Sequence, residues 1–218
     1  MFVLSCEPAT CAVPEWHREL FKGHEETLTS EGWSPGSLNL AQAFATKLRT
    51  LLAHGDITKL LVDFSCRPDD PERFSRFSLK LTEEQKRKLD ERHHLAHLNL
   101  LKQRIREELA RESTAIHLSL RTEDRPDMGT VELAHDPSRE VESNFVRKWA
   151  EALRAAAPEL SIRSVTDPNY GLSTALREEF TPAFGSVSVI TARSSFLESN
   201  PIRWDKLKKL MLETLPRQ

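Results

Sequence analysis

Hydrophobic and polar positions along the chain follow two different periods. Short apolar runs at residues 2–7, 60–64, 115–120, 130–133, 160–165 and 187–191 have the length and composition of β-strands, and the half-polar run 160–165 is typical of an edge strand. Apolar side chains that recur every three to four residues predict helices over 38–52, 81–109, 138–156 and 200–211. Shorter helices are expected at 14–21 and 171–177, and loops at 22–32 and 65–75.

Strands that alternate with helices predict a three-layer α/β/α architecture with a mainly parallel, mixed sheet. A length of 218 residues suits a single domain spanning residues 1–218. We find no internal repeat.

The composition of the chain indicates which partners it can bind and in which cellular compartment it is expected. A net charge of -2 with 29% charged residues leaves no basic excess for nucleic acid. Cys6, Cys11 and Cys66 are odd in number and lack C-x-x-C spacing, which favours reduced thiols. We see neither a basic segment followed by a long apolar one at the start nor a run of about 20 apolar residues. The sequence therefore predicts a cytoplasmic protein that binds neither nucleic acid nor membranes.

Chemistry-bearing side chains follow the predicted strands. Glu7, Asp63, Arg121 and Arg193 each come at or just after a strand end, and Ser34 opens the turn before a helix. In open α/β sheets such positions meet in one crevice outside the carboxyl ends of the strands. We therefore expect these residues to line a common cleft.

The same segments resemble one known family. Ser5-Cys6-Glu7-Pro8, followed by Val13-Pro14, is similar to the opening of the N-formylglutamate amidohydrolases, in which the glutamate precedes a histidine. Residues 34–38 resemble the family's Asp-Pro-Gly-Ala-Leu, and residues 61–66 its Leu-Val-Asp-Leu-Asn-Arg. Residues 117–122 look like its His-x-Ser-x-His-Ser, residues 171–177 like its Gly-x-Thr-Thr-Ala-Leu-Arg, and residues 187–191 like its late strand Glu-x-Glu-x-Asn. The resemblance implies a phosphorylase/hydrolase-like fold of the zinc exopeptidase kind and a zinc-dependent amide hydrolase.

The residues that would hold zinc differ from the family at most positions. Such a site needs about three protein ligands and a carboxylate base. By the resemblance, ligands are replaced by Pro8, Ser34 and Arg121, the late-strand carboxylates by Val187 and Val189, and the substrate-positioning pair by Ser65 and Cys66. Proline offers no donor atom, and a protonated guanidinium repels a divalent ion.

These differences predict a catalytically inactive relative that needs no cofactor. Arg121 is expected to replace the charge of the metal and to pair with Glu7 across the cleft. Arg177, with Arg121 and Arg193, would suit a small carboxylate ligand, and a protein partner is a further expectation. The alternative is an active hydrolase of N-acyl or N-formyl amino acids with zinc held by Glu7, His117 and a third group that the sequence does not place, such as His24 or Asp63. Against it, His117 is expected to be a hydrogen-bonded core residue, about 13 Å deeper than Arg121.

Three other groups invite chemical interpretations. His93, His94 and His97 share a helix and could hold a metal, but we expect them to be surface or half-buried packing residues. Asp69 and Asp70, near Glu72, are expected to be solvated loop acids rather than a cation site. Cys6 is expected to be a buried structural residue, with no base such as His17 placed to activate it.

Overall fold

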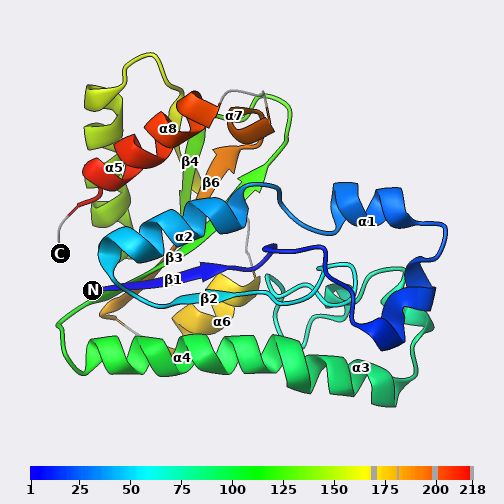
Figure 1. Ribbon diagram of the computed structural model, residues 1–218. Helices are drawn as coiled ribbons and strands as arrows, with labels where there is room; N and C mark the ends of the chain where they lie inside the picture. Colours follow the sequence, from blue (N-terminus) through cyan, green and yellow to red (C-terminus); the bar gives the residue numbers. More distant parts are fainter. Residues whose placement is uncertain (168–170, 181, 198–200, 217–218) are drawn as a thin grey trace.

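A six-stranded sheet forms the centre of the computed structural model, which describes residues 1–167, 171–180, 182–197 and 201–216 (Figure 1). The strand order is β2 (Leu52–His54), β1 (Phe2–Cys6), β3 (Ala115–Glu123), β6 (Phe184–Ala192), β4 (Val131–His135) and β5 (Ile162–Thr166). The strands β2, β1, β3 and β6 run parallel, whereas β4 is antiparallel to β6 and parallel to β5. The predicted mixed, mainly parallel sheet is confirmed, with β5 at its edge.

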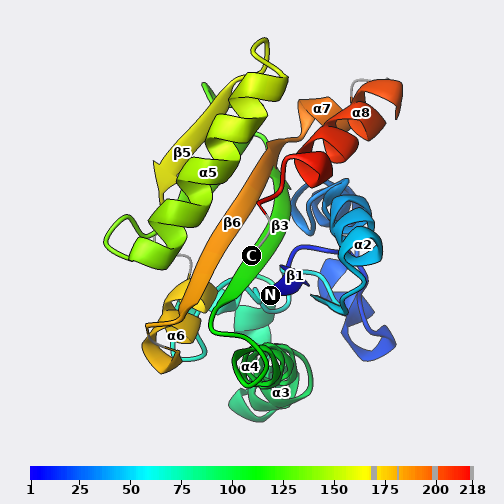
Figure 2. The same ribbon diagram turned by 90° about the vertical axis from the view of Figure 1, so that its left-hand side faces the viewer.

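Helices cover both faces of the sheet, as the alternating pattern predicts (Figures 1 and 2). One face packs against α2 (Ser37–Leu48), α5 (Glu140–Ala156) and α8 (Pro201–Glu213). The other packs against α4 (Leu95–Leu109) and α6 (Gly171–Glu179), and α3 (Glu83–Leu89) extends α4 past the sheet. Shorter elements are α1 (Glu25–Glu31), α7 (Ser194–Leu197) and 3₁₀ turns at Glu15–Phe21, Pro71–Arg73 and Ser78–Lys80. Asn200, the expected start of the last helix, lies outside the described residues.

Two apolar cores hold these layers together. On the α2/α5/α8 face, Leu118 and Leu120 of β3 meet Phe44 and the fully buried Trp149. On the α4/α6 face, Leu101 and Ile105 of α4 pack with Leu176 and Phe184, among others. Each such aliphatic or aromatic side chain stabilises the fold by about 1.5–3 kcal/mol on burial. Among the described residues, no helix combines the length and apolar character needed to span a bilayer.

The predicted strand at residues 60–64 is wrong. Leu60, Leu61, Val62 and Phe64 are buried, but they form turns and irregular backbone packed in a third apolar cluster. Phe21, Phe74, Phe77, Leu81 and Leu89 surround them there. A short apolar run marks burial, and burial in a side cluster requires no strand pairing. The strand that pairs with β1 is instead β2, three residues long.

Two further boundaries differ from the sequence prediction. The helix predicted over 38–52 ends at Leu48, because Arg49 adopts a left-handed conformation with φ of 53°, and the chain then enters β2. Residues 25–31, predicted as loop, form α1, none of whose residues is buried. Without a buried face, α1 lacks the apolar periodicity by which a helix is found in a sequence.

The long helix predicted over 81–109 is confirmed, with a change of pitch in the middle. Thr82 caps α3 through a capping box with Gln85, a role for which threonine is a preferred residue. A π-helical segment, Asp90–His94, joins α3 to α4. Such segments often occur at functional sites. This one places His93 and His94 in buried positions just before the residues of α4 that face the sheet.

Candidate functional site

The sheet carries a polar stripe on the face that α4 and α6 cover. Ser5 of β1, His117, Ser119 and Arg121 of β3, and Ser186 and Ser188 of β6 alternate with the core residues of the opposite face. Val187 and Val189, predicted for the cleft, are fully buried in the opposite apolar core, so this placement is wrong. Because side chains alternate along a strand, a shift of one residue in the sequence match moves every side chain to the other face. The cleft side of β6 presents serines instead.

Glu7 is the most tightly held acid of this stripe. It follows β1 and is 1% exposed. Its Oε1 lies 3.4 Å from His97 Nε2, its Oε2 accepts a 2.5 Å hydrogen bond from Ser119, and Arg121 Nη2 lies 3.5 Å away. The predicted pairing of Arg121 with Glu7 is therefore confirmed, although Arg121 lies within β3 rather than after it. His97 was missed as a partner, because its helix position does not show that it faces the end of β1.

The surroundings of Glu7 keep its carboxyl ionised. Burial alone would raise the pKa of Glu7, since a charge is disfavoured away from water. The hydrogen bond with His97 and the electrostatic interactions with His97 and Arg121 outweigh burial, so the pKa of Glu7 is lowered. Glu7, His97, Ser119 and Arg121 form what we call the Glu7 cluster, in which Arg121 is the counter-ion of Glu7.

His117 is the hydrogen-bonded core histidine that the sequence analysis favours. Its Nε2 is 2.7 Å from Ser5 Oγ and its Nδ1 is 2.8 Å from Ser186 Oγ. Burial lowers the pKa of His117 to about 4, with Glu7 opposing the shift. Both ring nitrogens are occupied by hydroxyl groups, so His117 is not presented to the cleft.

Arg177 is not available to a ligand, contrary to its predicted place in the cleft. Its guanidinium donates to both carboxylate oxygens of Glu142 at 2.9 Å, to Asp167 Oδ2 at 2.6 Å and to the carbonyl oxygen of Ser186 at 2.7 Å. Burial opposes the charge of Arg177, but these two carboxylates outweigh it and raise its pKa. Arg177 fixes α6 to α5 and β6, a role that no local pattern around it indicated.

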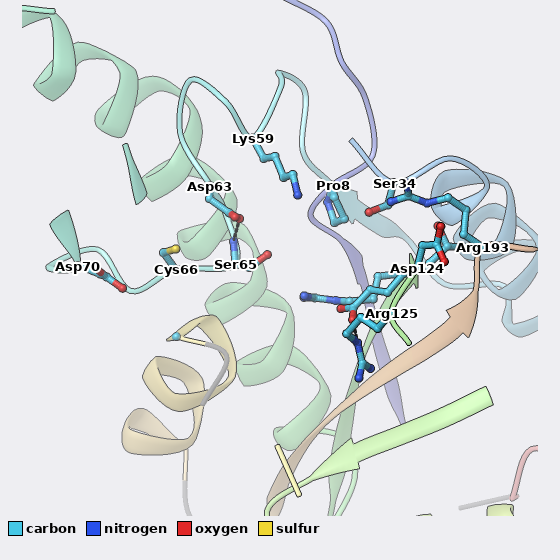
Figure 3. A pocket seen from close by; sticks show the side chains of 14 residues that line it. Pro8, Ser34, Lys59, Asp63, Ser65, Cys66, Asp70, Asp124, Arg125 and Arg193 are labelled. Carbon is cyan, nitrogen blue, oxygen red and sulfur yellow. Dashed lines mark hydrogen bonds and ion pairs between the residues drawn. The ribbon is translucent and has the colours of Figure 1, made fainter. Parts of the chain in front are cut away.

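A pocket of about 430 Å³ opens at the carboxyl ends of the parallel strands (Figure 3). Seven of the residues expected there line it: Pro8, Ser34, Asp63, Ser65, Cys66, Arg121 and Arg193. The sequence analysis missed five charged lining residues: Lys59, Asp70, Glu123, Asp124 and Arg125. The convergence of strand ends on one pocket is what open α/β sheets favour.

Two solved structures have folds similar to that of this chain. The chain is similar to gene product Atu2144 from Agrobacterium tumefaciens, with a TM-score of 0.77 and 18% identity over 98% of this chain and 88% of that chain. It is also similar to an N-formylglutamate amidohydrolase from Ralstonia eutropha JMP134, with a TM-score of 0.71 and 13% identity over 97% and 90%. The chain has the N-formylglutamate amidohydrolase fold. No model of a known protein family and no curated protein sequence matches it.

Within this N-formylglutamate amidohydrolase fold, the side chains present do not fit a zinc ion. Among the described residues, no three His, Cys, Asp or Glu side chains are arranged to hold a metal. The guanidinium of Arg121 lies beside Glu7, where it would repel a divalent cation. His24, one of the two residues suggested as a third ligand, is exposed at the start of α1 and packs against Phe77. The zinc ligand set of the alternative interpretation is therefore not assembled.

The histidines of the long helix are each engaged separately. His93 Nδ1 lies 2.9 Å from Asp56, His94 Nε2 lies 3.0 Å from the carbonyl oxygen of Cys66, and His97 contacts Glu7. All three are buried, so the expectation of surface or half-buried positions is wrong, while their separate partners agree with a packing role. His93 and His94 lie in the π segment, and His97 follows in α4.

The remaining polar groups of the loop and the thiols are also accounted for. Asp70 caps the 3₁₀ turn Pro71–Arg73 through the Glu72 N–H, and Asp69 pairs with Arg67. Cys66 lines the pocket, but burial, with Asp63 nearby, raises the pKa of its thiol to about 12. Burial also raises the pKa of Cys6, as expected of a structural thiol. Both thiols stay protonated near neutral pH and are poor nucleophiles.

The charges in the pocket fall into paired and open groups. Arg121 is beside Glu7, and Arg125 pairs with Glu123 and with the buried Glu132. For Lys59 and Arg193, the described part of the chain offers no carboxylate within 4.0 Å. These two cations are the ones that a ligand in the pocket can reach without breaking an internal pair.

Proposed function

We propose that this protein binds a small carboxylate in the strand-end pocket and does not carry out metal-dependent hydrolysis. The observation that carries the proposal is the position of Arg121, 3.5 Å from the buried Glu7. In this arrangement a fixed guanidinium supplies the positive charge next to the acid. Metal-assisted hydrolysis needs a cation there, together with a water molecule that the cation polarises.

Lys59 and Arg193 are the groups that would bind the carboxylate. Arg121 and Arg177, two of the three arginines first considered for this purpose, are already paired with internal carboxylates. Lys59 and Arg193 line the pocket without such a partner among the described residues. Hydrogen bonds from a charged side chain to a carboxylate are roughly twice as strong as neutral ones. A pocket of about 430 Å³ has the size of sites for small metabolites.

The first test separates binding from hydrolysis. Purified protein would be analysed for zinc, and N-formyl-L-glutamate and N-acetyl-L-glutamate would be incubated with it, with and without a chelator. We expect far less than one zinc ion per chain and no chelator-sensitive release of glutamate. Near-stoichiometric zinc, or turnover abolished by chelation, would overturn the proposal in favour of an active hydrolase.

The second test locates the carboxylate site. Calorimetric titration with a panel of small carboxylates should show binding that Lys59→Met and Arg193→Met each weaken by about tenfold, the effect of removing one charge-assisted hydrogen bond. Lys47→Met is the matched control, because Lys47 is exposed on α2 and does not line the pocket. Equal affinities of Lys59→Met and the control would remove Lys59 from the site.

A further inference from the structure

The open charges of the pocket are divided between two sides. Figure 3 shows Asp63, Ser65, Cys66 and Asp70 on one side of the cavity, and Ser34, Arg193, Asp124 and Arg125 on the other, with Lys59 and Pro8 between them. Acidic oxygens therefore face the cavity from the side opposite to the guanidinium of Arg193. A ligand that spans the pocket meets both signs of charge.

We propose that the ligand is a free amino acid, whose carboxylate binds Lys59 and Arg193 and whose ammonium group binds Asp63. This inference rests on the carboxylate binding proposed above and adds the chemical identity of the second group. The lining holds four basic residues, Lys59, Arg121, Arg125 and Arg193, and four acidic ones, Asp63, Asp70, Glu123 and Asp124. A balanced pocket complements a zwitterion better than it complements a dianion.

Asp63 is held in place by the loop and has a carboxylate oxygen available. Its Oδ1 accepts the N–H of Ser65 at 2.8 Å, its own N–H donates to the carbonyl oxygen of Arg73, and its carbonyl oxygen accepts the N–H of Cys66. These bonds fix the orientation of the side chain, and the other oxygen, Oδ2, is not needed for them. No cation of the described chain lies within 4.0 Å of Asp63. An ammonium group would supply the missing partner.

The other acids of the pocket are less suited to this role. Glu123 pairs with Arg125, and Asp70 uses Oδ1 to cap a 3₁₀ turn. Asp124 is exposed and lies on the side of Arg193, where water and salt screen its charge. Asp63 is half-buried, so its interaction with a ligand is screened less.

The test compares free and blocked amino groups in otherwise identical ligands. The probes are the twenty common L-amino acids and their N-acetyl derivatives, titrated calorimetrically at pH 7 and low salt. We expect the best free amino acid to bind at least tenfold more tightly than its N-acetyl form. The variant Asp63→Asn should remove this preference and leave the affinity for the N-acetyl form unchanged. Asparagine keeps an oxygen that can accept the Ser65 N–H, so the loop is retained.

The control variant and the outcomes separate the two proposals. Asp69→Asn removes the same charge from the same loop but from a residue outside the pocket lining, and it should leave both affinities unchanged. N-acetyl forms that bind as tightly as free amino acids, or an Asp63→Asn variant that weakens both equally, would overturn the ammonium site while carboxylate binding survives. Binding of neither class would overturn both proposals. Should Asp63→Asn not fold, the comparison of ligands on the unaltered protein decides alone.

Discussion

Replacing Arg121 by methionine tests whether a fixed guanidinium serves as the counter-ion of this fold. Arg121 has a side chain only 7% exposed, and that of Glu7 is fully buried. Methionine retains much of the length of the arginine stem, so the change removes charge more than volume. His97 and Ser119 remain in contact with Glu7 in the variant.

The loss of unfolding free energy in Arg121→Met depends on the cost of an unpaired buried charge and on the cost of protonating Glu7. Removing one partner of a buried ion pair costs about 3–5 kcal/mol, because the other charge is left uncompensated. Glu7 can instead take up a proton in the variant. For a carboxyl of ordinary pKa this costs about 3.7 kcal/mol at pH 7 and about 1 kcal/mol at pH 5, which limits the loss of stability. We therefore expect Arg121→Met to lower the free energy of unfolding by about 3 kcal/mol at pH 7 and by about 1 kcal/mol at pH 5.

The sign of this pH dependence comes from the lowered pKa of Glu7. A carboxyl whose pKa is lower in the folded than in the unfolded protein stabilises the fold above its ordinary pKa, and this contribution is lost as the pH falls through the folded value. Without Arg121 the folded pKa of Glu7 rises, so the variant loses this contribution at higher pH than the wild type. The two proteins should therefore become more alike in stability under acidic conditions.

Urea unfolding at both pH values provides the measurement, and the chain offers a close control. Arg147 lies 3.5 Å from Glu151, the same separation as between Arg121 and Glu7, but both side chains are more than half exposed. Arg147→Met should change the stability by about 0.5 kcal/mol or less. The double variant Glu7→Gln/Arg121→Met should lose less unfolding free energy than the sum of the losses of the two single variants. Each single variant leaves one charge of the pair without its partner, whereas the double variant removes both charges. An Arg121→Met variant as stable as the Arg147→Met control would refute the counter-ion role.

Two further predictions concern the turn before α2 and the buried histidine. Gly36 has φ of 88°, and a Cβ there would lie 2.7 Å from Phe196, so Gly36→Ala should lower the free energy of unfolding by about 2 kcal/mol or more. Gly23, with φ of 75° and open space around it, is the control. Gly23→Ala should lower the free energy of unfolding by about 1 kcal/mol through backbone strain alone. Equal losses in thermal or urea unfolding would show that contact with Phe196 does not matter. His117 should stay neutral down to a pH of about 4, and because the unfolded chain gains the proton first, stability should fall as the pH drops from about 6.5 toward 4. Nuclear magnetic resonance of the ring nitrogens checks this, and protonation of folded His117 near pH 6.5 would contradict it.

The sequence was most informative where local pattern and burial agree. The alternation of Leu118 and Leu120 with His117, Ser119 and Arg121 marks one apolar and one polar face of β3, and the structure has both. Two elements start where local features of the sequence place them. Pro14, with its fixed backbone angle, precedes Glu15–Phe21, and Thr82 caps α3 by local hydrogen bonds. The pairing of Glu7 with Arg121 could be expected because both lie near the carboxyl ends of neighbouring strands.

The features that the sequence did not predict depend on contacts between residues far apart in the chain. Arg177 looks like a ligand-binding residue until Glu142 and Asp167 are brought to it from α5 and the segment after β5. His97 meets Glu7 across 90 residues of sequence, and no local pattern around either residue shows that α4 brings them together. The run 60–64 shows the same limit for the fold, since its burial came from a loop cluster and not from the sheet.

The polar stripe explains how this fold holds a buried carboxylate at the end of β1 with a positive charge from its own side chains. A buried carboxylate at the end of β1 is costly unless a positive charge stands beside it, and a metal ion or an arginine can each provide one. Here Arg121 provides it without any dependence on metal supply, and Ser119 and His97 satisfy the remaining hydrogen bonds of Glu7. Because Arg121 and Arg177 are both paired with internal acids, the ligand binding proposed above rests on three other residues, Lys59, Asp63 and Arg193, which line the pocket. Stability and ligand binding thus depend on different side chains, so a variant at Asp63 should change ligand preference while leaving the Glu7 cluster intact.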